Sequence, residues 1–395
     1  MALAAYAALV LYASLYPFAW RQPTGPLWEF MKHLGPRPAP SDIAVNFIAY
    51  IPLGFLIAKV SRGPGRSFLI AVGTCAALSF GVETAQRFIL YRYSALSDFL
   101  CDTAGGVAGA WAWLLVRHEG VVGAGLWRAI DRMTGGSPAR LAAWCAACAW
   151  GVAQAVPIRS GIVVGNVRAW REVARAAVHS SLTFAPREGI GYALTAAAVI
   201  LVARYSLRLP MARLLLLVLA ACTVAGKTML NGAALPPEWA PATVLGALLA
   251  LLVPEPDRPT IMAIVALSFL ALELTPTPGG TRHPFNFVPF EGEITIRMNG
   301  IRVMLEQAWS FMAMAALLTS NRRVVHERGL MWAGANAVGC FVFCLEWAQR
   351  HVPGRYGDIT TVMIAVVAWL GTWMFVAAAT EQDSRRAARA VRTVN

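Results

Sequence analysis

The sequence predicts an all-α, polytopic integral membrane protein with about 12 transmembrane helices. Of its 395 residues, 57% are hydrophobic and 14% are charged, and the mean hydropathy is +0.55. Soluble globular chains have a smaller apolar share and carry roughly 25% charged residues. The apolar residues also form long stretches, and about 20 such residues in a helix cross the hydrocarbon core of a bilayer.

Twelve apolar stretches have about this length. Each predicts a helix, because a helix satisfies the hydrogen bonds of its own backbone groups in lipid. They are residues 2–20, 43–60, 67–89, 98–116, 140–157, 182–203, 211–230, 238–253, 259–275, 302–319, 329–349 and 358–379.

The twelve stretches divide into three sets of four, which predicts three four-helix units. The units are residues 1–117, 118–255 and 256–380, and a basic tail follows at residues 381–395. In each set the first helix ends near a proline, and a short basic loop joins the second and third helices. An even number of spans puts both termini on one side, and the basic loops and tail indicate that this side is cytoplasmic.

The net charge of +13 does not indicate a nucleic-acid partner. The basic residues lie at the ends of apolar segments and form no aromatic-lined basic surface. Phosphate-binding loops, zinc-protease motifs and serine-hydrolase elbows of standard type are absent from the sequence, and no cofactor is predicted.

One ten-residue string stands out because it recurs 263 residues later. Residues 83–92 and residues 346–355 share the pattern Glu-x-Ala-Gln-Arg-x4-Arg. On a helix, positions i, i+3 and i+4 share a face, as do Asp98 and Asp102 on the next predicted helix. Ionisable groups beside membrane spans are costly and mark functional sites by default. The sequence therefore predicts a pocket at the outer membrane edge, formed by Asn46, Glu83, Gln86, Arg87, Arg92, Asp98 and Asp102.

These residue types predict recognition of an anion. Arg87 and Arg92 would bind a phosphate or carboxylate in the bidentate manner that arginine favours. The carboxylates of Glu83, Asp98 and Asp102 would orient the arginines, transfer protons or hold a divalent cation, although the cluster has no histidine and no metal site is predicted. The structural alternative is two ion pairs, Glu83 with Arg87 and Asp98 with Arg92, that tie the helices together.

The recurring string predicts a second, poorer site in the third set. Its residues are Glu346, Gln349, Arg350, Arg355 and Asp358. Aligning Asp358 with Asp98 places Val362 at the position of Asp102 and Ala365 at that of Gly105, with Trp309 near that of Asn46.

The first set resembles the VanZ-like family of bacterial membrane proteins, over roughly residues 5–117. The resemblance is carried by Asp42-x3-Asn46, Tyr50-Ile-Pro-Leu-Gly-Phe55, Glu83-x2-Gln86, Arg92, Asp98 and Asp102-Thr-Ala-Gly105. Asp102 stands where the family commonly has asparagine. Residues 259–378 resemble the family weakly, and residues 118–255 carry no motif. The resemblance implies a four-helix membrane unit, and the founding member is linked to low-level resistance to the glycopeptide teicoplanin.

Together these features predict a multi-pass protein of the bacterial inner membrane that binds an anionic envelope component, such as a lipid-linked phosphate or a cell-wall precursor. Three alternatives stay open. They are a membrane enzyme acting on lipid-linked phosphate, a lipid carrier, and a structural partner in an envelope-polymer assembly.

Overall fold

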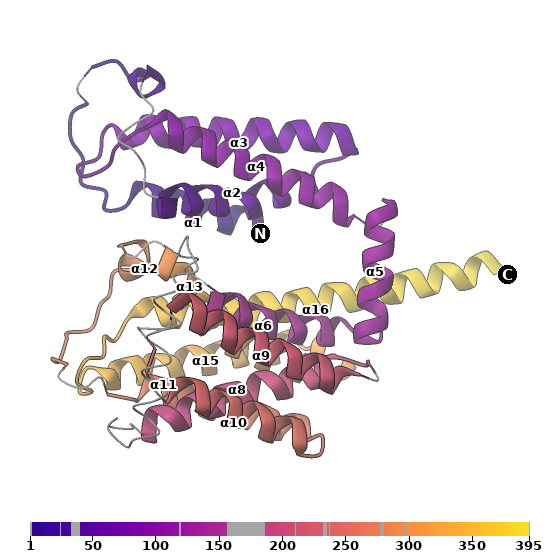
Figure 1. Ribbon diagram of the computed structural model, residues 1–395. Coiled ribbons are helices and arrows are strands. Elements are labelled where there is room, and N and C mark those ends of the chain that lie inside the picture. Colours follow the sequence, from indigo (N-terminus) through magenta and orange to yellow (C-terminus); the bar gives the residue numbers. More distant parts are fainter. Residues whose placement is uncertain are drawn as a thin grey trace. The chain divides into compact units, whose positions relative to one another are not determined.

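The computed structural model describes residues 2–23, 25–32, 40–117, 120–155, 186–209, 211–231, 235–236, 238–276, 280–295 and 298–394. In these ranges every regular element is a helix (Figure 1), which confirms the all-α class. The described chain divides into two compact units. The first unit comprises Met1–Ala129 and Ile294–Gly300, and the second comprises Ile130–Glu293 and Ile301–Asn395.

The first unit is built from four helices and a short 3-10 helix. The helices are α1 (Ala2–Leu15), α2 (Pro40–Val60), α3 (Pro64–Gln86) and α4 (Leu96–Val116), with η1 (Glu29–Lys32) between α1 and α2. The helix α5 (Val121–Thr134) follows α4. Within this unit α2 packs against both α3 and α4, and α1 packs against α2 and α3.

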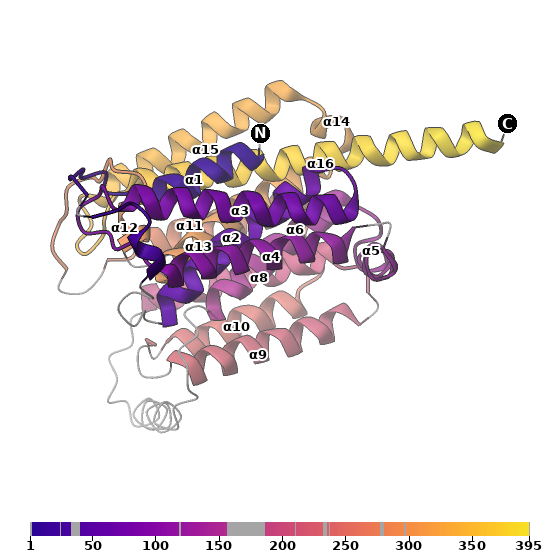
Figure 2. The ribbon, with the colours of Figure 1, turned by 90° about the horizontal axis from the view of Figure 1, so that it is seen from above.

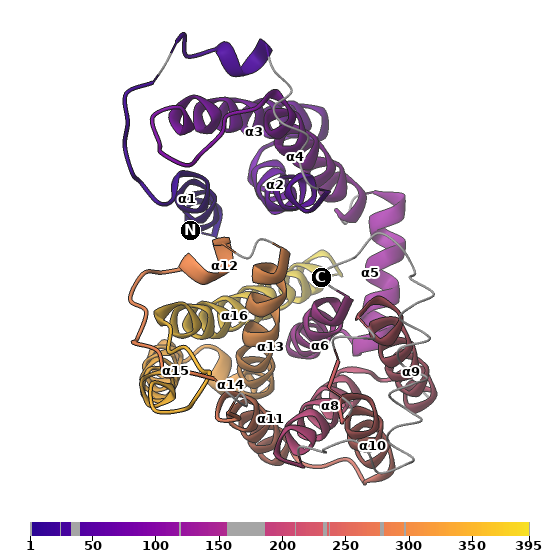
Figure 3. The same ribbon diagram turned by 60° about the vertical axis from the view of Figure 1, so that its left-hand side comes forward.

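The second unit holds most of the remaining helical residues, while the end of α12 and the start of α13 fall in the first unit. Figure 3 shows α8 between α10 and α11. Figure 2 shows α15 lying beside α16. The bounds are α6 (Pro138–Ala155), α8 (Pro186–Ser206), α9 (Ala212–Asn231), α10 (Trp239–Leu252), α11 (Arg258–Glu273), α12 (Glu291–Thr295), α13 (Met298–Thr319), α14 (Arg322–Val325), α15 (Arg328–Gln349) and α16 (Ile359–Val394).

Each predicted stretch overlaps one helix, but fewer helices meet the length and hydropathy needed to cross a membrane. Among the described residues, seven do so, and they begin at Asp42, Pro64, Leu96, Arg187, Asn299, Arg328 and Ile359. The chain is thus a multi-pass membrane protein, while twelve spans are not confirmed. The three-unit division stays a prediction, since the predicted second and third sets fall mainly within one compact unit.

Glycines allow α2 and α4 to lie close together, as the Gly-x-x-x-Gly pattern predicts. A Cβ on Gly105 would lie 2.2 Å from the carbonyl oxygen of Phe47, and one on Gly109 would lie 2.0 Å from that of Ile51. These distances are shorter than any van der Waals contact, so larger residues would separate the two helices. This contact places Asn46 and Asp102 on facing helices.

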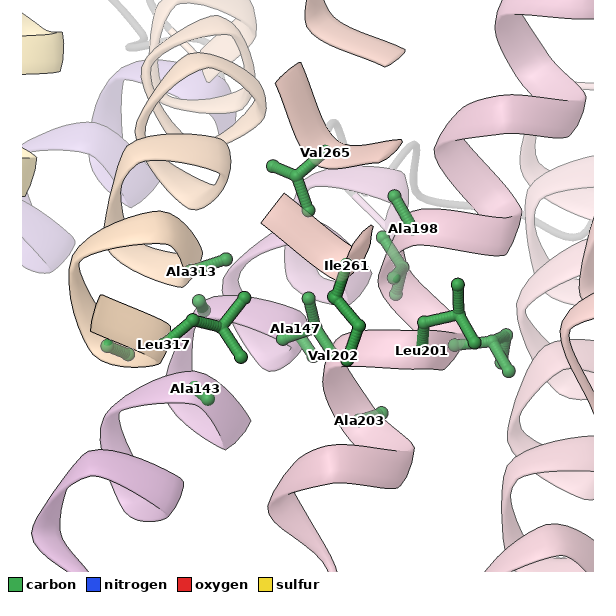
Figure 4. Packing of buried hydrophobic residues seen from close by; sticks show 14 of the residues in the cluster. Ala143, Ala147, Ala198, Leu201, Val202, Ala203, Ile261, Val265, Ala313 and Leu317 are labelled. Carbon is green, nitrogen blue, oxygen red and sulfur yellow. The ribbon is translucent and has the colours of Figure 1, made fainter. Parts of the chain in front are cut away.

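The core of the second unit is made largely of small and branched apolar side chains (Figure 4). Ala143 of α6, Val202 of α8, Val265 of α11 and Ala313 of α13 are each fully buried there. Small residues let helix backbones approach closely where lipid supplies no hydrophobic driving force between helices. The predicted middle set therefore contributes packing surface to the C-terminal helices.

Candidate functional site

Glu83 lies in the last turn of α3 with only 2% of its surface exposed. Its Oε2 accepts the backbone N–H of Ala95 at 2.8 Å, at the first turn of α4, where the helix dipole favours negative charge. The hydroxyl of Ser94 donates to the Glu83 carbonyl at 2.6 Å. Glu83 thus holds the loop between α3 and α4. These contacts differ from the Glu83–Arg87 ion pair of the structural alternative, since Arg87 is paired with Glu29.

Arg92 reaches back from this loop to the end of α1. Its Nε donates to the carbonyl of Tyr16 and its Nη2 to that of Ala13, both at 2.8 Å. The last carbonyls of a helix have no intrahelical donor, and a cation there also complements the dipole. Gln86 adds a third bond, from its Nε2 to the carbonyl of Ser14 at 3.0 Å. The motif therefore joins α3, its following loop and α1.

Arg87 pairs with a carboxylate that the sequence did not single out. Its Nη2 lies 3.0 Å from Oε2 of Glu29 in η1, and Arg21 Nε donates to the Arg87 carbonyl at 3.2 Å. The loop after α1 is brought here by backbone bonds, from Arg21 N–H to Phe88 at 2.6 Å and from Leu90 N–H to Ala19 at 2.7 Å. Nothing in the local pattern of residues 21–32 signals this pairing.

These contacts surround an open pocket of about 220 Å³ at the loop end of the first unit. It is lined by Arg21, Glu29, Phe30, Arg87, Arg92, Tyr93 and Ser94. Two predicted site residues, Arg87 and Arg92, line this pocket. Sequence reasoning missed Arg21 and Glu29, because their positions depend on the fold of a loop between helices.

The remaining predicted residues lie on the helices. Asp102 is 5% exposed, and its Oδ2 accepts the Ser79 hydroxyl at 2.8 Å. The buried Tyr50 hydroxyl lies beside Asp102 without completing a hydrogen bond of good geometry to any described residue. Asp98 lies beside Asn46, and its Oδ1 accepts the Ser97 hydroxyl at 3.3 Å.

Of the seven predicted residues, only Arg87 and Arg92 are therefore among the described residues that line this pocket. Arg87 and Arg92 face it, whereas Glu83 and Gln86 fix its loop and Asn46, Asp98 and Asp102 belong to the α2–α4 contact. We call Tyr50, Ser79 and Asp102 the buried polar triad. Among the described residues, no three His, Cys, Asp or Glu side chains are arranged to hold a metal ion.

The second motif repeats the helix-tying contacts of the first. Glu346 Oε2 accepts the N–H of Asp358 at 2.9 Å, as Glu83 accepts that of Ala95. Arg355 donates from Nε to the carbonyl of Thr275 at 2.8 Å and from Nη2 to that of Leu272.

The amide contact of the first motif also has a counterpart. Gln349 Nε2 donates to Oε2 of Glu273 at 2.9 Å, where Gln86 bonds the Ser14 carbonyl. Arg350 differs from Arg87, since its guanidinium lies 4.1 Å from the centre of the Trp347 ring.

These contacts correct the predicted alignment of the two motifs. Asp358 occupies the place of Ala95, not that of Asp98, because its N–H meets the motif glutamate. Ala95 and Asp358 are 263 residues apart, which is also the separation of the two motifs. With this separation the counterpart of Asp102 is Ala365, not Val362.

The predicted counterpart of Asn46, on the helix that faces α16, is corrected in the same way. Gln307 of α13 donates to Thr361 Oγ1 at 3.1 Å, as Asn46 of α2 approaches Asp98, so Gln307 and not Trp309 is the counterpart of Asn46. The buried polar triad then corresponds to Phe311, Val342 and Ala365, which form one apolar cluster.

Asp358 instead begins α16 and contacts the loop that follows α11. Its Oδ1 accepts from Thr360, at 2.7 Å from the N–H and 2.6 Å from the hydroxyl, and its Oδ2 accepts from Asn286 at 3.2 Å. Glu293 of α12 is buried beside it, and burial, together with the charge of Asp358, raises the pKa of Glu293 above its ordinary value.

Comparison with known proteins identifies the first segment. The family model described as VanZ/LLP1 matches residues 3–117, which cover α1 to α4 and the pocket. The second motif lies outside this match, so a second family copy is not confirmed. Comparisons with curated proteins and with solved structures gave no match. Over residues 3–117, this multi-pass membrane protein is therefore similar to the VanZ/LLP1 family.

Proposed function

We propose that this VanZ-like membrane protein binds an anionic component of the bacterial cell envelope, a lipid-linked phosphate or a cell-wall precursor. The observation that carries the proposal is the presence of three arginines, Arg21, Arg87 and Arg92, in the lining of one open pocket. Glu29 is the single carboxylate in that lining, so the pocket is positively charged overall. Arginine binds phosphate and carboxylate oxygens with parallel N–H donors.

The position of the pocket favours a ligand that is anchored in lipid. The candidate span of α3 ends at Gln86 and that of α4 begins at Leu96, so the pocket residues of the intervening loop lie at the membrane edge. Phe30 and Tyr93 add aromatic surface to the lining. A headgroup phosphate would meet the arginines while its hydrocarbon chain stays in the bilayer. By the distribution of basic residues this edge is extracytoplasmic.

Recognition is favoured over hydrolysis because the one carboxylate in the pocket lining, Glu29, is ion-paired with Arg87, and the other predicted acid–base groups lie outside the lining. Asp98 and Asp102 are absent from the pocket lining, and Asp102 is hydrogen-bonded to Ser79 in the α2–α4 contact. Glycopeptide resistance is the physiological setting we propose, and it rests on the family resemblance.

The test is binding of polyprenyl phosphate to the full chain in nanodiscs. Arg21→Gln removes one pocket guanidinium from an exposed loop position, and we expect at least roughly a tenfold loss of affinity, as for a lost charge-assisted hydrogen bond. Lys32→Gln is the matched control, since it removes one exposed positive charge from the neighbouring η1 outside the pocket lining. Equal affinity of the two variants would contradict the proposal.

The same preparation separates the alternatives. Release of phosphate from a polyprenyl diphosphate would show an enzyme, and movement of labelled lipid between leaflets would show a carrier. Wild-type protein without saturable binding, turnover or transfer would leave a structural role.

A further inference from the structure

The helix α5 occupies a segment that the sequence places between two spans. It has 14 residues, which makes it too short to cross a bilayer, and it follows the candidate span of α4, which ends at Val116. Figure 1 shows α5 turning away from the direction of α4.

Two contacts fix α5 to the end of α4. The indole Nε1 of Trp127 donates to the carbonyl of Val116 at 2.6 Å. A Cβ on Gly123 would lie 1.9 Å from the carbonyl oxygen of Arg117, so only glycine permits this approach. The helix is therefore held at the depth where α4 leaves the membrane.

The two faces of α5 differ in polarity. Val122 and Leu126 are one helical turn apart on an apolar face and are 61% and 41% exposed, and Ile130 continues this face. Arg128 and Arg132 lie on the opposite side, also exposed. A short helix with this pattern is suited to lie in the plane of a membrane interface.

Basic residues gather at the same end of the first unit. The turn between α2 and α3 and the start of α3 lie at this end because α2, α3 and α4 alternate in direction. Residues 59–66 and 117–132 of the sequence contain two acidic residues, Glu119 and Asp131, against six basic residues, namely Lys59, Arg62, Arg66, Arg117, Arg128 and Arg132. Such clusters beside a span attract anionic phospholipid headgroups.

We propose that α5 is an interfacial helix that binds the anionic phospholipid surface. Val122 and Leu126 insert between acyl chains, and Arg128 and Arg132 lie among the headgroup phosphates. This surface is at the opposite end of the first unit from the arginine pocket and is independent of the proposed function.

Hydrogen exchange of residues 121–134 tests this in the full chain. We expect slower exchange in nanodiscs containing phosphatidylglycerol than in pure phosphatidylcholine, with a difference of about fivefold per arginine involved. Arg128→Gln/Arg132→Gln should abolish the difference between the lipids, whereas the control Asp131→Asn should keep it. Leu126→Glu should speed exchange in both lipids.

Exchange in residues 64–86 of α3 reports whether each variant is folded. Equal exchange of α5 in the two lipids for the wild type would overturn the binding of anionic headgroups. Slow exchange in folded Leu126→Glu would show that α5 is covered by something other than acyl chains and would overturn the proposed insertion.

Discussion

The N-terminal set of helices, α1 to α4, and the C-terminal set, α11, α13, α15 and α16, use the same contacts to join their helices but differ inside. In both, a buried glutamate accepts a loop N–H and an arginine caps the first helix. The buried polar triad Tyr50–Ser79–Asp102 has the apolar counterparts Phe311, Val342 and Ala365. The shared motif is thus a device for tying helices, and it does not by itself mark a binding site.

The surroundings of the first arginine of each motif also differ. Arg87 pairs with Glu29 beside an open pocket that also holds Arg21. Its counterpart Arg350 stacks on Trp347. Within the proposed function, this difference favours the N-terminal set as the place where the ligand binds.

The largest expected effect comes from placing a carboxylate in the apolar counterpart of the triad. Ala365→Asp buries a charge beside Phe311 and Val342, and we expect about 3 to 5 kcal/mol of destabilisation, as for other unpaired buried charges. The double variant Ala365→Asp/Val342→Ser supplies the donor that Ser79 supplies to Asp102 and should recover about 1 kcal/mol.

Thermal unfolding in detergent measures both variants. No recovery in the double variant would mean that Ala365 and Val342 do not correspond to Asp102 and Ser79.

Removing the arginine that caps the first helix of each set should have a smaller effect, of similar size in the two sets. Arg92→Met and Arg355→Met each leave two helix-terminal carbonyls without their guanidinium donor, and we expect about 2 to 3 kcal/mol of destabilisation from each. Lys59→Met, at an exposed helix end, is the control. A large effect at Arg92 with none at Arg355 in thermal unfolding would show that only the first motif ties helices.

The smallest expected effect is a pH dependence of stability that arises from Glu293, which lies beside Asp358 at the start of α16. Burial raises the pKa of Glu293 above its ordinary 4.5, so the folded state binds its proton more tightly than the unfolded state does. Stability from this group is then present at low pH and is lost as pH rises from about 4.5 towards the raised pKa. Glu293→Gln should remove that loss.

The measurement is the difference in melting temperature between wild type and Glu293→Gln at pH 4.5 and at pH 7. Going from pH 4.5 to pH 7, the variant's free energy of unfolding should rise relative to that of wild type by less than about 1 kcal/mol. Its melting temperature should rise relative to wild type accordingly. An unchanged difference would contradict the raised pKa.

Much of the helix pattern could be predicted from the sequence, because apolar stretches in lipid have few alternatives to a helix. The predicted helix boundaries were less accurate where a loop forms hydrogen bonds with the end of a helix. The predicted span 67–89 ends at Gln86, since the following residues turn to pair with Trp20. The amphipathic α5 was missed because it lies between long apolar stretches and is itself of mixed polarity.

The sequence by itself determined the membrane class, the helical content, the resemblance of the first segment and the importance of the Glu-x-Ala-Gln-Arg-x4-Arg string. Only the tertiary structure decided what that string does, because its glutamate and second arginine bind backbone groups that no side-chain pattern reveals. The structure also divided the predicted cluster and brought Arg21 and Glu29 to Arg87. Those contacts depend on how a loop folds back across helix ends, and such long-range closure leaves no periodic signal in the chain.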